Sequence, residues 1–342
     1  MKIKSIAIVA GLLFAVSAQA QDWQGRVHWT GSVGDSDYYN AANWVVMEGP
    51  QVGQNVVPAK DGTLDFDMFL DADTDSTPEV VVTNDTTINT VHMGGATWIT
   101  PPTAASDVTF TIDANFTVIF WFVVGEQFGS HGTINLNGGS LTVGNDFEFG
   151  DLMIGAHQGG SGILNVNGGA VITCWNLFYS FDGGGDLSQQ FGHINLSNGT
   201  INVHNALITN DRGYIDITEG QLNIAGNWEV AIITNQVAWG HIKAYGGDGE
   251  VLASYNAGTG MTEITATEPL PLLSEPTCWI DASNLYWSST NTALYSVDYK
   301  TDLVTGAWQE LTNDIAATPF TNSIPLPTEI SDPAFFRVHA YH

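Results

Sequence analysis

The sequence predicts an all-β protein: a right-handed parallel β-helix with an N-terminal β cap and a small C-terminal antiparallel β domain. The first observation is a strand–turn–strand motif that occurs four times, and each copy begins with a glycine: Gly132, Gly162, Gly192 and Gly213. The second is the spacing of two between apolar residues inside each copy, which is the periodicity of a strand. Such a unit cannot bury its apolar face alone, so copies 21 to 30 residues apart indicate stacking into a solenoid.

Aligned on their glycines, the copies show which side chains we expect in the core. Two columns precede the turn: Ile134, Leu164, Ile194, Ile215 and Ile242, then Leu136, Val166, Leu196, Ile217 and Ala244. Two columns follow it: Leu141, Val171, Ile201 and Leu222, then Val143, Thr173, Val203 and Ile224. The polar residues between the first two columns should point the other way: Asn135, Asn165, Asn195 and Asp216. Glycines mark the bend, where positive φ is cheap only for glycine: Gly139, Gly169, Gly199, Gly220 and Gly247. A degenerate fifth copy begins at Gly240.

The first 20 residues have the layout of a cleavable secretory signal. Lys2 and Lys4 precede an apolar run from Ile6 to Val16, and Ala18-Gln-Ala20 supplies small residues before Gln21. The run is too short to span a bilayer. We therefore expect an exported protein, outside the cell, at its surface or in a periplasm, with no membrane insertion after cleavage.

The chain is strongly acidic, with 36 Asp and Glu residues against 8 Lys and Arg residues and a formal net charge of −28. Removal of the leader takes away Lys2 and Lys4 and leaves 6 basic residues against 36 acidic ones, a charge of −30. Such a surface repels nucleic acid, anionic lipid and charged glycans, which bind to basic patches. Nucleic acid is therefore not an expected partner, and the acidity either keeps the protein soluble or holds hard cations.

Three segments follow the leader. Residues 21–79 carry many aromatic side chains without the repeat, and we assign them to an N-terminal β cap over the open strand edges. Residues 80–268 hold the repeats. The proline-rich stretch Thr267–Pro276 ends them, and residues 269–342 form a linker and an antiparallel β module, where runs such as Leu294–Tyr299 alternate like strands.

The glycine-anchored repeats resemble β-helices of secreted bacterial proteins, including autotransporter passengers, adhesins and the pectate-lyase-like superfold. The segment from Trp29-Thr-Gly to Ala-Asn-Trp44 is similar to the start of many such proteins. The tail, with Tyr295-Ser-Val, Trp308 and Phe336-Arg-Val, resembles a β-sandwich module common near their C-termini. The resemblance covers most of the chain after the leader and implies an architecture rather than an activity.

Enzymes with this fold act on polysaccharides, so a glycan hydrolase is the alternative function. A lyase needs a basic residue, and residues 130–268 offer only Arg212 and Lys243. A hydrolase needs two carboxylates facing each other across the scissile bond. The available acids have no spacing that singles out a pair: Asp146, Glu148, Asp151, Asp211, Asp216 and Glu219. Because serine-nucleophile and zinc motifs are also missing from the sequence, we assign no catalytic residue.

An acidic run, Asp71-Ala-Asp-Thr-Asp-Ser-Thr-Pro-Glu79, is the candidate metal site. Oxygen ligands at alternate positions converge on one hard cation when the backbone curls around it. We expect calcium as the cofactor, with the ligands Asp71, Asp73, Asp75 and Glu79. The run lacks the glycine of an EF-hand loop and contains Pro78, so a plain acidic turn is the alternative.

The two cysteines, Cys174 and Cys278, suit an oxidising compartment. A disulfide between them would tie a repeat turn to the C-terminal segment. Two unpaired thiols are the equal alternative, because spacing alone does not fix the distance between the sulfur atoms.

Four aromatic residues are candidates for carbohydrate binding: Tyr214, Trp228, Trp239 and Tyr245. The tyrosines fall at outward-facing repeat positions, and the tryptophans lie in or near corners. An exposed aromatic face can stack on a sugar ring, whereas burial at corners would make the same residues part of the fold.

Together these features lead us to expect a secreted, non-enzymatic, structural or adhesive protein of the cell surface or extracellular matrix. Its expected partners are polysaccharides, other surface or matrix proteins, and further copies of itself. The alternative is a hydrolase that uses a carboxylate pair on a neutral glycan.

Overall fold

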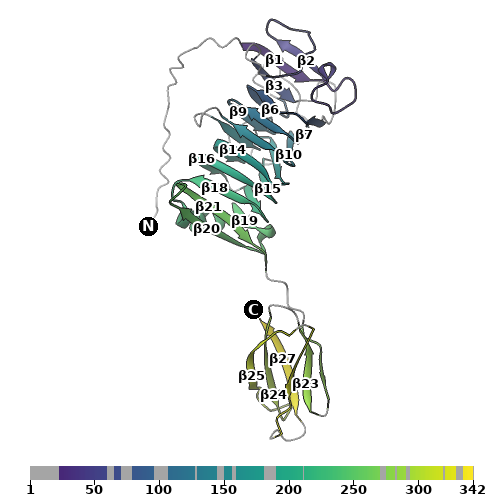
Figure 1. Ribbon diagram of the computed structural model, residues 1–342, viewed down its shortest axis with the longest axis vertical. Helices are drawn as coiled ribbons and strands as arrows, with labels where there is room; N and C mark the ends of the chain where they lie inside the picture. The colour runs from purple at the N-terminus through teal and green to yellow at the C-terminus, as the bar shows by residue number, and fades with distance from the viewer. Residues whose placement is uncertain are drawn as a thin grey trace. The chain divides into compact units, whose positions relative to one another are not determined.

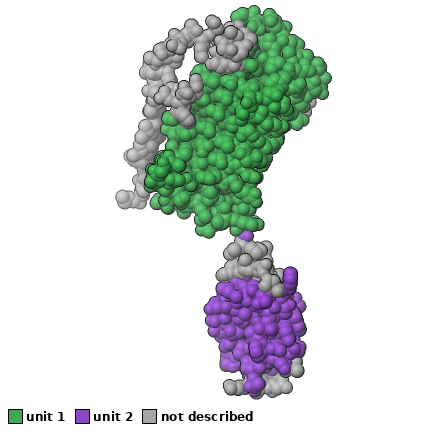
Figure 2. Space-filling model, in the orientation of Figure 1, with its two compact units in different colours: residues 1–268 green, residues 269–342 purple. Residues whose placement is uncertain are grey.

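The structure is a computed structural model of the chain. It describes residues 23–59, 65–70, 79–95, 107–127, 129–144, 150–155, 159–180, 190–210, 212–269, 275–281, 283–289, 293–318, 320–328 and 334–341. The chain divides into two compact units, residues 1–268 and 269–342 (Figure 1, Figure 2). The division falls within the proline-rich stretch, and the described parts of both units consist mostly of β-strands.

The first unit contains two large sheets between which the chain alternates. The seven-stranded sheet is parallel throughout and has the order β19-β17-β15-β13-β10-β7-β4. Its strands are β4 (Glu79–Val82), β7 (Asp107–Ile112), β10 (His131–Leu136), β13 (Ser161–Val166), β15 (Gly192–Leu196), β17 (Gly213–Ile217) and β19 (Ile242–Ala244). Each strand pairs with its counterpart in the neighbouring repeat, which produces the rows of aligned strands visible in Figure 1.

The 14-stranded sheet holds the other strand segments of the same repeats. Its strands are β1 (Trp23–Trp29), β2 (Trp44–Glu48), β3 (Asp65–Leu70), β5 (Thr86–Ile88), β6 (Thr90–Met93), β8 (Asn115–Val118), β9 (Trp121–Val124), β11 (Ser140–Val143), β12 (Asp151–Ile154), β14 (Ala170–Tyr179), β16 (Gly199–Thr209), β18 (Gln221–Ala225), β20 (Glu250–Asn256) and β21 (Met261–Thr267). From β3 to β18 the pairing is parallel, and the apolar side chains of both sheets form one core cluster.

The two core columns of the seven-stranded sheet are confirmed residue by residue. Successive strands place these residues opposite one another: Ile134, Leu164, Ile194, Ile215 and Ile242, and likewise Leu136, Val166, Leu196, Ile217 and Ala244. All of them are buried. Because a fully buried Leu or Ile side chain contributes roughly 1.5–3 kcal/mol, these columns are a main source of stability in the first unit.

One repeat departs from the predicted alignment after its turn. Ile172 and Cys174 occupy the core positions that the sequence alignment gives to Val171 and Thr173. This copy has one residue more between its two core strands than the copy before it. A shift of one residue moves every following side chain to the other face of a strand. The prediction for Val171 and Thr173 was therefore wrong, and Val171 is 38% exposed.

The same shift buries Cys174, and both cysteines are free thiols. The predicted disulfide between Cys174 and Cys278 is not present in the structure, which has the alternative of two unpaired thiols. Cys174 is a buried residue of the core of the first unit. Burial raises the pKa of the Cys174 thiol well above its usual range, and the Asp151 carboxylate adds to this effect. A protonated, buried thiol is unreactive.

Close approach of the backbone explains the anchoring glycines. The four are register partners without positive φ: Gly132, Gly162, Gly192 and Gly213. A Cβ atom on Gly192 would lie 2.2 Å from the backbone oxygen of Ile154 and 2.2 Å from the backbone nitrogen of Ser180. The bend glycines are of two kinds, because Gly139 has the predicted positive φ of 65° whereas Gly199 is restricted by packing against the Ala170 carbonyl.

Both ends of the first unit leave the parallel pattern. At one end, β1 pairs in parallel with β3 and antiparallel with β2, and η1 (Ala41–Asn43) precedes β2. The aromatic side chains of this cap include the buried Trp29, Tyr38 and Trp44. At the other end, β19 continues the parallel sheet, but β20 and β21 form an antiparallel hairpin on β18. The fifth copy is thus only half formed, and the hairpin replaces its second strand.

Short helices complete this end of the first unit. They are α1 (Glu229–Ala231), the π-helix η2 (Ile232–Val237) and the 3-10 helix η3 (Tyr245–Gly247). Across the described ranges, the helices are all too short or too polar to cross a membrane.

The second unit consists of two three-stranded antiparallel sheets, β22-β23-β26 and β25-β24-β27. The strands are β22 (Cys278–Ile280), β23 (Asn284–Ser288), β24 (Leu294–Lys300), β25 (Gln309–Ala316), β26 (Thr321–Pro325) and β27 (Phe335–Tyr341). Leu285 and Trp287 of β23 share a buried cluster with Tyr295 and Val297 of β24, so the two sheets have one core.

Replacing Gly192 by alanine should lower the free energy of unfolding of the first unit by about 1–3 kcal/mol, because the new methyl group meets backbone atoms that cannot move aside. Denaturant unfolding followed by tryptophan fluorescence measures this loss. The matched control is Gly138→Ala, where nothing lies within 4 Å of the added Cβ atom and φ is not positive. Equal losses in the two variants would contradict the packing explanation.

A thiol-reactive dye should label one cysteine per native chain and two after unfolding. The labelled residue is Cys278, which is exposed, whereas Cys174 is buried and protonated. In a Cys278→Ser variant, native labelling should disappear. Rapid labelling of Cys174 in that variant would show that the core position assigned to it is incorrect.

Candidate functional site

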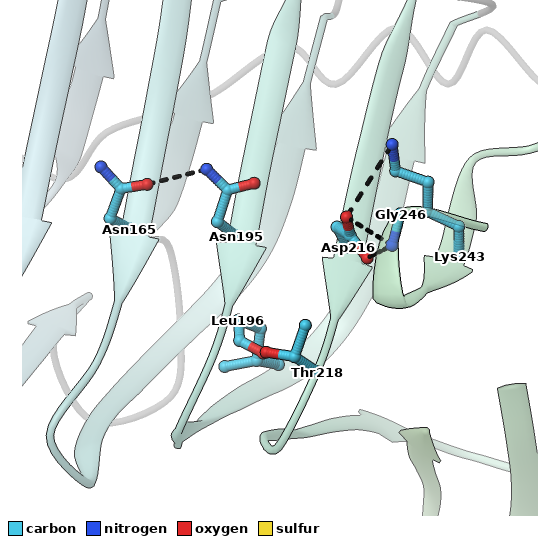
Figure 3. Close-up of polar contacts among 7 residues, drawn as sticks. All are labelled: Asn165, Asn195, Leu196, Asp216, Thr218, Lys243 and Gly246. Atoms are coloured by element: carbon cyan, nitrogen blue, oxygen red, sulfur yellow. Dashed lines mark hydrogen bonds and ion pairs between the residues drawn. The ribbon is translucent and has the colours of Figure 1, made fainter. Parts of the chain in front are cut away.

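The outer face of the seven-stranded sheet carries a ladder of asparagine side chains. Asn165 donates from Nδ2 to Oδ1 of Asn135 at 2.8 Å. Asn195 donates to Oδ1 of Asn165 at 2.8 Å (Figure 3). Stacked amides of this kind satisfy one another, and each such bond contributes a net 0.5–1.5 kcal/mol or so. The ladder is therefore part of the scaffold.

Asp216 ends this ladder with a charged group. Its two oxygen atoms accept hydrogen bonds from the backbone nitrogen of Gly246 at 2.9 and 3.0 Å, and Nζ of Lys243 lies 3.9 Å from Oδ2 (Figure 3). Asp216, one of the acids considered for hydrolysis, thus holds the η3 turn at the end of the sheet.

Asp151 belongs to a second polar ladder, on the 14-stranded sheet. It accepts a hydrogen bond from Nδ2 of Asn176 at 2.7 Å, and Asn205 donates from Nδ2 to Oδ1 of Asn176 at 2.8 Å. Burial raises the pKa of Asp151, and the bond from Asn176 opposes that rise. Of the other acids considered, Glu219 is exposed, and Asp146, Glu148 and Asp211 lie outside the described residues.

Tyr214 takes part in a stack of rings on the seven-stranded sheet. The ring of His193 lies parallel to it with centroids 4.0 Å apart, and Nζ of Lys243 lies 3.6 Å from its centroid. Two groups this close to one centroid must cover opposite faces. His193 stacks in turn on Phe191 at 4.6 Å. Because both faces of its ring are occupied, we assign Tyr214 to the fold rather than to a sugar.

Tyr245 is also used by the fold. It has a positive φ of 49° within the η3 turn, and its half-buried ring packs against the core. A Cβ atom on Gly249 would lie 2.8 Å from this ring, which shows how closely the two residues approach.

Three of the four predicted calcium ligands, Asp71, Asp73 and Asp75, lie outside the described residues. The fourth, Glu79, is an exposed residue at the start of β4. Within the described ranges, no cluster of three or more His, Cys, Asp or Glu side chains is arranged to hold a metal ion. Calcium at residues 71–79 stays a prediction.

The remaining candidates, Trp228 and Trp239, lie near a hollow at the end of the 14-stranded sheet. β18 pairs with β16 only along Thr200–Val203, so the second half of β16 has no partner in β18. Trp228, α1 and η2 follow β18 in the chain and form the opposite wall. The hollow has a volume of about 170 Å³, and its described lining residues are Asn205, Leu207, Ile224, Trp228, Ala231, Ile232, Asn235 and Gln236.

The lining combines an aromatic wall and an apolar floor with neutral amides. Trp228 is 48% exposed, and its indole is fixed because Nε1 donates to the Ala225 carbonyl at 2.8 Å. Its backbone nitrogen donates to Oγ1 of Thr262 at 2.8 Å. All described lining residues are uncharged, although the whole chain has a net charge of −28. Apolar walls with a few placed polar groups are typical of small-molecule sites.

Trp239 is connected to the same hollow through a histidine. His241 donates from Nδ1 to Oε1 of Gln236 at 3.2 Å, and Trp239 packs edge-on against the His241 ring with centroids 5.9 Å apart. Trp239 is 65% exposed. Gln236 itself belongs to the π-helix η2, an element that is rare and often occurs at functional sites.

Sequence analysis identified Trp228, which lines the hollow, as a candidate but missed the amides beside it. These amides come together only because β16 extends beyond its pairing with β18 and η2 lies beside the extension; they are Asn205, Asn235 and Gln236. Nothing in their spacing indicates this, since Asn205 is 30 residues from Asn235.

Comparison with known proteins yields no family: no family model matches the chain, and the curated proteins and the solved structures give no match either. The function must therefore be inferred from the residues of this chain.

Acid should destabilise the first unit partly through His193. Burial in the ring stack lowers the pKa of His193, and the nearby Lys243 ammonium group lowers it further. A histidine in the unfolded chain titrates near pH ~6.5, so as the pH falls below 7 the unfolded state takes up a proton that the folded state resists. The contribution of His193 to the free energy of unfolding is therefore complete above pH ~6.5. It decreases as the pH falls through the lowered pKa of the folded state.

Thermal unfolding at pH 7.5 and pH 5 tests this with a His193→Phe variant, which keeps a stacked ring but does not titrate. The decrease in melting temperature between the two pH values should be smaller in the variant. His204, whose pKa is also lowered by burial, is present in both proteins and cancels. An identical decrease in both proteins would exclude His193 as a source of the acid sensitivity.

Proposed function

We propose that the chain is a secreted, non-catalytic β-helix protein of the cell surface or extracellular matrix that binds a neutral polysaccharide at the hollow beside Trp228. The long parallel sheets and the strand register between repeats support a right-handed β-helix over residues 80–268. The shared core of two antiparallel sheets supports a C-terminal β-sandwich module. The signal-like residues 1–20 support export.

The observation that carries the binding proposal is the uncharged, partly aromatic lining of the hollow in a very acidic chain. A half-exposed, fixed indole offers a flat apolar face without the entropy cost of ordering it on binding. The three amides supply donors and acceptors for hydroxyl groups. An anionic sugar would meet a net charge of −28 without a basic residue in the described lining, so a neutral sugar is favoured.

Among the acids considered for hydrolysis, Asp151 and Asp216 have contacts that support a scaffold role. Asp216 is bound to the η3 turn, and Asp151 is the end of an amide ladder. Neither belongs to the described lining of the hollow. Hydrolysis requires two carboxylates across the scissile bond, so these positions argue against a pair at the proposed binding site.

The proposal is tested by affinity electrophoresis of the protein without residues 1–20 in gels that contain neutral polysaccharides or a polyuronate. We expect slower migration with at least one neutral polysaccharide and none with the polyuronate. Trp228→Ala should weaken that binding about tenfold or more, since a tryptophan at the centre of a site contributes about 2 kcal/mol.

The matched control is Trp121→Ala, which removes an exposed tryptophan of β9 that is 50% exposed and does not line the hollow. Unchanged migration with every neutral polysaccharide would overturn the binding proposal, as would equal effects of the two variants. Release of reducing ends that is abolished by Asp151→Asn or Asp216→Asn would favour the hydrolase instead.

A further inference from the structure

We propose that the hollow beside Trp228 holds the acetamido group of an N-acetylated amino sugar, so that the bound polysaccharide contains N-acetylhexosamine. This inference rests on the proposed function, because it names the class of sugar that the same site takes. Three properties of the hollow support it: its size, its apolar floor and the orientation of its amides.

The size of the hollow favours one small substituent over a length of glycan. Its volume of about 170 Å³ is below the roughly 300–1,000 Å³ of sites for drug-sized ligands. A chain of sugars therefore lies outside the hollow, against the exposed tryptophans, and places one group inside.

The floor of the hollow suits a methyl group. Ile224 and Ile232 are buried residues of the core, and Leu207 is a half-buried residue that packs against it. A methyl group placed on this floor gains about 0.8 kcal/mol from burial. A hydroxyl group at the same place would lose its bonds to water without replacement from these side chains, which is unfavourable. The floor thus distinguishes an acetamido group from the hydroxyl of a plain hexose.

The ladder behind Asn205 fixes which of its atoms is available. An ionised carboxylate only accepts hydrogen bonds, so Asp151 draws Nδ2 of Asn176 toward itself. Oδ1 of Asn176 then accepts from Nδ2 of Asn205. This leaves Oδ1 of Asn205 without a partner in the part of the chain that the structure describes. Asn205 therefore offers an acceptor to the hollow that it lines.

Gln236 offers a hydrogen-bond donor to the hollow, whereas Asn205 offers an acceptor. Its Oε1 accepts from Nδ1 of His241, so its Nε2 is the atom that remains available as a donor. One available acceptor and one available donor, on two residues that line the same hollow, match the N–H and C=O groups of a secondary amide. The acetamido group carries this amide together with the methyl group that the floor requires.

Two tetrasaccharides that differ only at carbon 2 test the inference: β-1,4-linked N-acetylglucosamine and β-1,4-linked glucose. Titration calorimetry on the protein without residues 1–20, at 150 mM salt, should show about tenfold or tighter binding of the N-acetylated tetramer. Asn205→Leu and, independently, Gln236→Met should each weaken binding of the N-acetylated tetramer about tenfold, so that its advantage over the glucose tetramer is lost in either variant. Trp228→Ala should weaken binding of both tetramers, and Trp121→Ala of neither.

The outcomes separate this inference from the proposed function. Equal binding of the two tetramers, lost in Trp228→Ala, would overturn the acetamido assignment and keep the glycan site. Binding of the N-acetylated tetramer that neither Asn205→Leu nor Gln236→Met changes would also overturn it, provided that the variants keep the wild-type melting temperature. If neither tetramer binds while another neutral polysaccharide still requires Trp228, the acetamido inference alone is wrong. If no neutral glycan binds at all, both proposals are wrong.

Discussion

The first unit depends on one constraint, the parallel register that places each repeat directly over its neighbour. Because side chains alternate along a strand, a slip of one residue would move a whole apolar column from the core to solvent. The anchoring glycines keep the strands close enough for this register, since the backbone at Gly192 leaves no room for a Cβ atom. Where one copy has an additional residue, the register is restored within the same strand, and Cys174 takes the core position.

The register that aligns the core also aligns the outer faces. Asn135, Asn165 and Asn195 bond to one another because they occupy the same position in successive repeats. His193 and Tyr214 stack for the same reason, as register partners on β15 and β17, and Phe191, which directly precedes β15, stacks on His193. In these two ladders of the regular part, the outward polar and aromatic groups therefore satisfy each other. Groups become available to a ligand where the stacking stops, as at Asn205, where β16 extends beyond β18.

The net charge of the chain and the uncharged lining of the hollow both favour the neutral sugar that we propose as ligand. A net charge of −28 disfavours anionic partners, and the uncharged lining beside Trp228 gives a charged group nothing to pair with. Asp151 influences this site at a distance. By accepting from Asn176 it orients two amides in succession, so a residue that touches no ligand decides whether Asn205 presents an acceptor or a donor.

The sequence by itself determined the all-β class, the repeat and most of the core. Period-two columns such as Ile134 to Ile242 are a local property of strands, and their burial follows from hydrophobicity alone. It also identified Trp228 and Trp239 as exposed aromatic residues, while Tyr214 looked equally available in the sequence. Only the tertiary structure decided between them, because the faces of Tyr214 are covered by His193 and Lys243, residues that lie 21 and 29 positions away.

The same holds for the hollow and for the cysteines. Asn205, Asn235 and Gln236 meet because strands of unequal length leave an open half-strand that a π-helix then faces, and no local pattern records that geometry. The position of Cys174 depends on one additional residue in the turn of its repeat. An alignment on the glycines does not show whether that residue belongs to the turn or to the strand that follows it. Sequence periodicity thus fixes what each strand buries. Contacts between segments distant in the sequence decide which outward groups remain free to bind.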